Sequence, residues 1–177
     1  RLSRRLLSAA SVAKGASQLR AAIRRLVNKS WLERHLGTDI PQSPYVLVLL
    51  HYQPEASTSM VAPRWVDQER VIEQLSINAP AGIRIVVKEN PKGFGWRGRQ
   101  YYSHILALNN VTLVHPSVAT DALLRGAAAV FAITGTVGME GIALGKKVAV
   151  LGRPSYDFFE GARKIDRPEE IFDHMRD

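Results

Sequence analysis

With 177 residues, 46% of them hydrophobic, the chain is long enough to bury the core of one ordinary domain. It has no cysteine, which excludes disulfides, thiolate zinc sites and a cysteine nucleophile, and no apolar run in it approaches the roughly 18 residues that a membrane-spanning helix needs. Eight of the 24 basic residues and none of the 16 acidic residues lie in the first 30 positions, so the formal charge of +8 belongs to that segment and the remainder is balanced. A body without net charge argues against a dedicated nucleic-acid-binding fold.

The basic N-terminal segment, residues 1–37, has apolar residues three and four positions apart, which predicts a helical arm. Ser30 and Glu33 have the spacing of a capping box, so a second, short helix is expected to begin there and to end at Gly37. Residues 38–44 contain two prolines and are expected to form a linker. Because the chain begins with arginine, we expect it to be a fragment of a longer protein or a trimmed version of one.

From residue 45 to residue 177, short apolar runs alternate with helical segments. The runs, expected to be strands, are residues 45–50, 83–87, 111–114, 129–133 and 148–151. The helical segments lie at about residues 65–77, 100–108, 118–125, 138–144 and 168–175. Strands that are apolar throughout are buried on both faces, and strand–helix alternation is typical of a parallel, doubly wound α/β sheet of the Rossmann type. Ligands of such sheets bind at the carboxyl ends of the strands.

The segment ITGTVGMEG, residues 133–141, is the strongest candidate site. A buried strand ends there, two glycines allow a tight turn, and a helix begins, so backbone N–H groups face the strand edge and could hold a phosphate. Thr134 and Thr136 add hydroxyl groups, and Glu140 could accept hydrogen bonds from a ribose. An ordinary strand-to-helix turn with threonine caps explains the pattern equally well.

Two further segments place polar side chains at strand ends. In VVKENPKGFGWRGR, residues 86–99, we interpret Lys88 and Glu89 as functional and the basic, glycine-rich residues 92–99 as an ordinary solvated loop. In HYQPEASTS, residues 51–59, Glu55 could act as a base or hold a sugar hydroxyl, and His51 could donate to a phosphate, although a lone histidine is more often part of the core. The five histidines lack metal-ligand spacing and there is no DxD pair, so no metal site is expected.

Taken in order, the segments QPEAST, VKENP, NNVTLV, TGTVGMEGIALGKKV and LGRPSYDFFEG resemble the capsule polysaccharide synthesis family, over about residues 45–161. That family includes bacterial β-Kdo transferases, which use CMP-Kdo. The resemblance implies a GT-B fold in which this chain is the CMP-sugar-binding half. It implies that the donor is bound without a metal or other cofactor by residues that match the family motifs: Gln53, Pro54 and Glu55; Lys88, Glu89 and Pro91; and Thr134, Gly135, Thr136, Gly138 and Glu140. Asn90 stands where the family has a histidine, and it joins His51 and Glu55 as a candidate catalytic residue.

The resemblance implies a glycosyltransferase of capsule or surface polysaccharide biosynthesis and export, which transfers a Kdo-like sugar to a glycan or glycolipid acceptor. It also implies a partner domain, the N-terminal half of the GT-B fold, and a cytoplasmic site of action. Two alternatives remain open: a sugar-nucleotide-binding module without catalysis, and a GT-B relative that uses UDP-sugars, such as a transferase or epimerase. The basic arm either packs on the partner domain, which we favour, or lies peripherally on the anionic inner membrane, or resembles a transit peptide.

Overall fold

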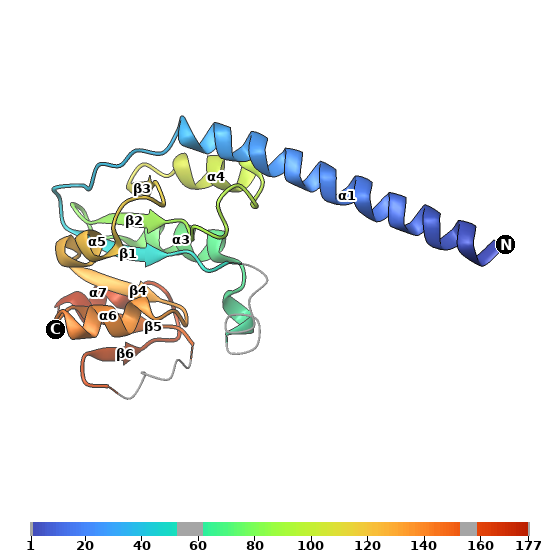
Figure 1. The fold of residues 1–177 in the computed structure, drawn as a ribbon. Helices are drawn as coiled ribbons and strands as arrows, with labels where there is room; N and C mark the ends of the chain where they lie inside the picture. The colour runs from blue at the N-terminus through green and yellow to red at the C-terminus, as the bar shows by residue number, and fades with distance from the viewer. Residues whose placement is uncertain (1, 53–61, 153–158, 177) are drawn as a thin grey trace.

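The computed structural model of the chain describes residues 2–52, 62–152 and 159–176. Its centre is a parallel sheet of six strands in the order β3-β2-β1-β4-β5-β6 (Figure 1). The strands are β1 Tyr45–Leu49, β2 Arg84–Lys88, β3 Val111–Val114, β4 Ala129–Ala132, β5 Lys147–Val150 and β6 Ala162–Lys164. The predicted α/β class with a doubly wound parallel sheet is confirmed. The strand order reverses between β1 and β4, and this is where sheets of this kind form their ligand crevice.

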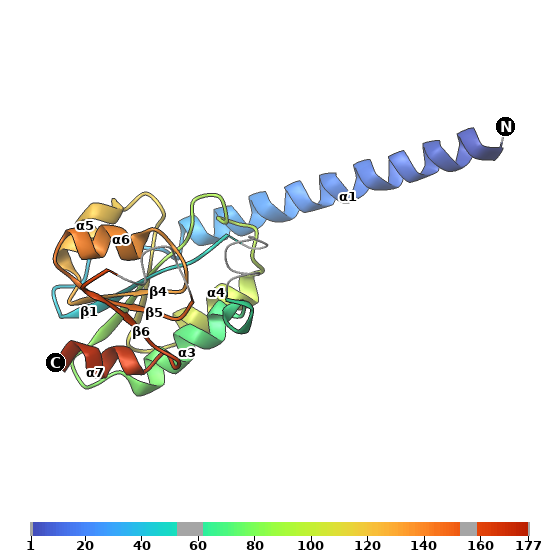
Figure 2. The same cartoon turned by 90° about the horizontal axis from the view of Figure 1, so that it is seen from below.

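Helices cover both faces of the sheet (Figure 2). One layer contains α3 (Gln68–Asn78), α4 (Arg99–Leu106) and α7 (Glu170–Arg176), and the other contains α5 (Thr120–Gly126) and α6 (Val137–Ala143). Alternate residues of β1 serve the two layers, since Val46 and Val48 belong to the core under α3, α4 and α7, whereas Tyr45 and Leu47 belong to the core under α5 and α6. The apolar runs of the sequence are therefore strands buried on both sides.

The N-terminal helix α1 is a single helix, Leu2–Glu33, and its first half projects away from the body (Figure 1). The predicted second helix beginning at Ser30 is therefore wrong, because α1 runs through Ser30 without a break. Its last turns are anchored on the body: Leu32 is fully buried and Leu36, just beyond the helix, is nearly so. This tertiary burial outweighs the local capping pattern. None of the described helices is both long and apolar enough to cross a membrane.

The segment that joins α1 to β1 also contacts the body. Gly37 forms an isolated parallel bridge with Val114, and the backbone N–H of His115 donates to the Gly37 carbonyl over 2.9 Å. Ile40 packs against the core under α5 and α6. Residues 37–40 thus extend along the β3 side of the sheet.

Two elements were not predicted. A short 3-10 helix, η1 Pro63–Trp65, precedes α3, and the side chain of Asp67 caps α3 by accepting from the Arg70 N–H at 3.2 Å. Helix α3 consequently begins at Gln68 rather than at Trp65. Strand β6 has only three residues, two of them charged, and lies at the sheet edge, where charged side chains are tolerated and the apolar signal of a strand is lost.

Candidate functional site

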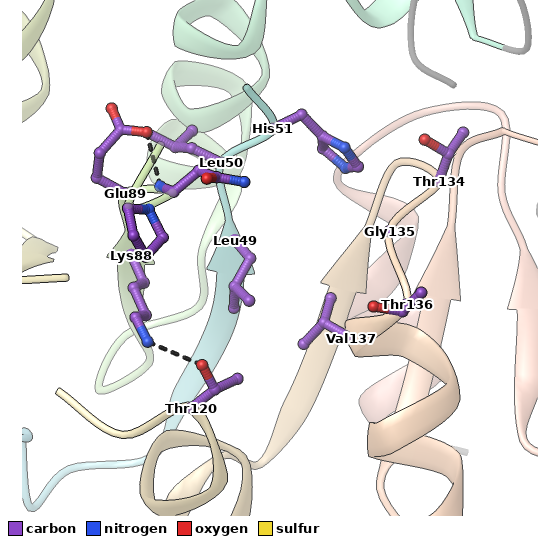
Figure 3. Close-up of a pocket in the computed structure, with 12 residues that line it drawn as sticks. Leu49, Leu50, His51, Lys88, Glu89, Thr120, Thr134, Gly135, Thr136 and Val137 are labelled. Carbon is purple, nitrogen blue, oxygen red and sulfur yellow. Dashed lines mark hydrogen bonds between the residues drawn. The ribbon is translucent and has the colours of Figure 1, made fainter. Parts of the chain in front are cut away.

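A cavity of about 410 Å³ opens at the carboxyl ends of the strands (Figure 3). Its walls are residues 49–51 at the end of β1, residues 88–91 at the end of β2, Thr120 at the start of α5, and residues 134–137 from the turn after β4 to the first residue of α6. It lies where the strand order reverses, and its volume is within the range of about 300–1,000 Å³ that is usual for small-molecule sites. The three segments that the sequence analysis singled out as candidate sites therefore meet in one place.

Lys88 supplies a buried positive charge to this cavity. The residue is only 6% exposed, and its Nζ donates to the Thr120 hydroxyl over 2.8 Å (Figure 3). Burial lowers the pKa of Lys88, and the carboxylate of Glu140 acts in the opposite direction. A desolvated ammonium attracts an anion more strongly than a hydrated one does, because the low local dielectric strengthens the interaction.

Glu89, the next residue, is directed into the protein rather than into the cavity. It is fully buried, and both of its carboxylate oxygens lie 2.6 Å from Nη1 of Arg97. Oε1 also accepts from the Asn90 backbone N–H at 2.7 Å, and Oε2 accepts from the Tyr102 hydroxyl at 2.7 Å. With these four hydrogen bonds, the carboxylate is held entirely by the protein.

The solvated-loop interpretation of residues 92–99 is wrong for four of them, because Gly93, Phe94 and Gly95 are buried and Arg97 is largely so. The side chain of Arg97 is 13% exposed and forms an ion pair with Glu89, and Phe94 is 6% exposed within the core. The physical reason is that a fully buried carboxylate needs a compensating charge, and a guanidinium provides one with fixed hydrogen-bond geometry. Burial beside Glu89 raises the pKa of Tyr102, and burial also raises that of Tyr101.

The turn after β4 forms the opposite wall. Gly135 approaches the ring of His51 so closely that a Cβ at this position would lie 3.1 Å from the His51 Cε1. The Thr134 hydroxyl is buried and has no hydrogen-bond partner within the described part of the chain. Thr136 also lines the cavity, but its side chain does not cap α6. A buried hydroxyl of this kind is available to a ligand.

Gly138 and Glu140, the other two candidate site residues of segment 133–141, lie beside the cavity rather than in its wall. Gly138 is buried in α6, where its N–H donates to the Gly135 carbonyl over 3.3 Å. Glu140 is exposed in the first turn of α6 and is close enough to Lys88 to oppose the lowering of its pKa.

His51 and Asn90 both line the cavity, and hydrogen bonds hold each of them in place. The His51 N–H donates to the Gln68 side chain at 2.7 Å, and the His51 carbonyl accepts from Gln68 and from Arg97. The Asn90 side chain accepts from the Lys92 N–H at 2.9 Å, which is the geometry of a turn residue. Gln53, Pro54 and Glu55 lie outside the described residues.

Supporting residues were missed by the sequence analysis. Gln68 and Thr120 each begin a helix and carry no pattern that marks them, since their importance comes from His51 and Lys88, which lie near them only in the fold. Among the described residues, no group of three or more histidine, aspartate or glutamate side chains could hold a metal ion.

Solved structures with a similar fold include two of KpsC from Thermosulfurimonas dismutans. Its β-Kdo 2,4 transferase is 24% identical, with a TM-score of 0.56, and the match covers 76% of this chain and 41% of that chain. Its β-Kdo 2,7 transferase is 18% identical, with a TM-score of 0.58, and the match covers 84% and 47%. Escherichia coli ADP-heptose lps heptosyltransferase II is 14% identical with a TM-score of 0.53, covering 84% and 50%. The chain thus spans less than half the length of the two KpsC chains.

These likenesses establish a fold shared with one half of GT-B glycosyltransferases. A comparison with curated proteins found no match. Residues 9–173, nearly the whole chain, match the family described as "Capsule polysaccharide biosynthesis protein". The chain therefore belongs to the capsule polysaccharide biosynthesis protein family.

Proposed function

We propose that this chain is the donor-binding half of a glycosyltransferase that uses a CMP-activated, Kdo-like sugar to build capsule or surface polysaccharide. The observation that carries the proposal is the buried Lys88 ammonium, which faces the cavity where the strand order of the sheet reverses. Opposite it, the Thr134 hydroxyl, which has no hydrogen-bond partner among the described residues, offers a polar contact to the same ligand. Two proteins of similar fold are β-Kdo transferases, which agrees with a donor of this class.

The charge of the cavity favours a nucleoside monophosphate sugar over a diphosphate sugar. Among the described lining residues, Lys88 is the only lysine or arginine, and the Glu140 carboxylate lies near it. At the phosphate itself, the phosphodiester of a CMP-sugar carries one negative charge, whereas the diphosphate of a UDP-sugar carries two; the carboxylate of a Kdo-like sugar lies on the sugar and is outside this count. Without a bound cation, a second phosphate charge would be desolvated with no second lysine or arginine beside it among the described lining residues, which is costly.

The leaving CMP would be stabilised by fixed donors rather than by a metal. Lys88 and the hydroxyls of Thr134 and Thr136 supply such donors around one cavity, with the backbone at Gly135. Preorganised donors of this kind act on the charge that develops in the transition state. In this proposal Gln53 and Glu55 contact the sugar, and Glu55 or His51 accepts the proton of the acceptor hydroxyl. Gly138 allows the close turn after β4, and Glu140 holds the ribose.

The acceptor side and a second Rossmann-like domain belong to the proposal as well. The outward side of α1 carries Val12, Leu19, Ile23 and Leu26, which are 52–70% exposed and recur at spacings of three, four or seven. These residues form an apolar stripe opposite Asn28 and Leu32, which face the body. We favour a second domain, with its glycan or glycolipid acceptor site, as the element that covers this stripe.

The competing occupant of the stripe is an anionic membrane surface, because basic residues flank it and each is worth about 1 kcal/mol near such a surface. Sedimentation with phosphatidylglycerol vesicles tests this directly. Binding that weakens steeply with salt, and that is lost in an Arg20→Glu/Arg24→Glu variant, would favour the anionic membrane surface as the occupant of the stripe. Absence of binding would leave the second domain as the occupant.

The proposed reaction is tested by following acceptor-dependent release of CMP from a CMP-sugar by the whole protein that contains this chain. We expect turnover that survives EDTA. Binding of CMP without turnover would favour the non-catalytic module instead. Turnover of UDP-sugars alone would favour a different GT-B relative and contradict the charge argument.

A further inference from the structure

A buried polar network lies behind the cavity and connects it to α1. Its centre is the Arg97 side chain, which Glu89 holds through two contacts of 2.6 Å. The guanidinium also lies over the Tyr101 ring, 5.1 Å from its centroid. None of these groups lines the cavity except Glu89, whose oxygens are fully engaged.

Arg97 joins the carboxyl ends of the two neighbouring strands. Nη1 holds the Glu89 carboxylate just after β2, while Nη2 donates to the carbonyl of His51 just after β1. Lys88 and Leu50, which immediately precede Glu89 and His51, form part of the cavity wall. One planar group therefore fixes the separation of two wall segments, which a flexible ammonium cannot do.

The backbone around Arg97 is in turn fastened to α1. Asn28, which is 5% exposed, donates from Nδ2 to the Arg97 carbonyl at 3.1 Å and to the Gly95 carbonyl at 3.2 Å. The Arg25 side chain donates to the Phe94 carbonyl at 3.3 Å. Gly95 has a φ of +81°, and a Cβ there would lie 2.8 Å from the Arg25 carbonyl oxygen, so only glycine fits this close contact. The loop between β2 and α4 lies against α1 accordingly (Figure 1).

We propose that Arg97 is a positioning residue for the donor site, and that Asn28 of α1 holds Arg97 in place. The structure thus forms a continuous chain of contacts from α1 through residues 94–97 to the two strand ends that form the cavity. Whatever displaces α1 will therefore alter the cavity. This inference rests on the proposed function in one respect, namely that the cavity is where the donor binds.

The experiment compares Arg97→Lys and Asn28→Ala with the control Arg84→Lys in the whole protein. Arg84 lies at the other end of β2 and donates to the Thr112 hydroxyl, so its replacement makes the same chemical change far from the cavity. Alanine favours helix more than asparagine does, so Asn28→Ala does not weaken α1 itself. Two quantities are measured: amide hydrogen exchange of peptides covering residues 48–52 and 88–92, and the Kd for CMP by calorimetry well below the unfolding temperature.

We expect faster exchange in both peptides for Arg97→Lys and Asn28→Ala, with exchange in α7 unchanged, and a Kd for CMP raised at least about tenfold. Arg84→Lys should change neither quantity. A purely structural role would lower the unfolding temperature but leave the Kd and the local exchange as they are, and that result would overturn the inference. If the wild-type protein binds no CMP, the proposed function fails, and hydrogen exchange alone decides whether Arg97 and Asn28 hold the cavity wall.

Discussion

Replacing Lys88 with methionine should separate ligand binding from folding. Methionine has nearly the length of lysine but no charge, so it fits the space that Lys88 occupies with 6% exposure. The variant loses the bond from Nζ to the Thr120 hydroxyl, worth about 0.5–1.5 kcal/mol, but it also avoids the cost of burying an ammonium. The free energy of unfolding is therefore expected to change by less than about 1.5 kcal/mol, in either direction.

Binding of CMP should change much more. A hydrogen bond to a charged group contributes about 1.5–3 kcal/mol, which corresponds to a Kd raised roughly 10- to 150-fold. Calorimetric titration with CMP gives the Kd, and urea denaturation gives the free energy of unfolding. Lys14→Met, on the exposed part of α1, is the matched control, because it removes the same charge far from the cavity. An equal Kd for CMP in the two variants would refute the assignment of Lys88 as the phosphate-binding cation.

Three further predictions concern the same cavity. Glu140→Ala should weaken CMP binding by about 1.5–3 kcal/mol without unfolding the domain, since Glu140 is exposed; an unchanged calorimetric Kd would make Glu140 structural. Asn90→His should raise kcat more than it changes KM, because an imidazolium can carry charge opposite the leaving phosphate; identical kcat values in steady-state kinetics would show that residue 90 is not beside it. Burial lowers the pKa of Lys88, so CMP affinity should fall as the pH rises through that lowered value, below the ordinary lysine value of about 10.4. Titrations at several pH values should show this loss in the wild type and not in Lys88→Met; parallel profiles would contradict it.

The sheet could be predicted because its strands are uninterrupted apolar runs in the sequence, which is typical of strands buried on both faces. β3 occupies the predicted residues 111–114, and the other four predicted strands are displaced by a single residue at one or both ends. β6 escaped prediction because Arg163 and Lys164 lie at an exposed edge and leave no apolar pattern. The capping box at Ser30 was misleading because burial of Leu32 keeps α1 helical.

The site could be predicted only in part. Lys88 ends a buried strand and Thr134 and Gly135 follow another, and topology alone brings such residues to one edge. Arg97 could not be recognised, since its partners His51 and Glu89 lie 46 and 8 positions away and nothing in a glycine-rich basic loop distinguishes a buried arginine from a solvated one. Glu89 has the sequence position of a ligand-binding residue, yet its four hydrogen bonds direct it inward.

The central claim is that the cavity recognises the CMP part of an activated sugar. Calorimetric titration of the protein with CMP, UMP, UDP and ADP under the same conditions tests it most directly. We predict the lowest Kd for CMP, and at 100 times that Kd a stabilisation of about 2.7 kcal/mol in a parallel melting curve. Equal affinities for all four nucleotides, or no binding of any of them, would contradict the account.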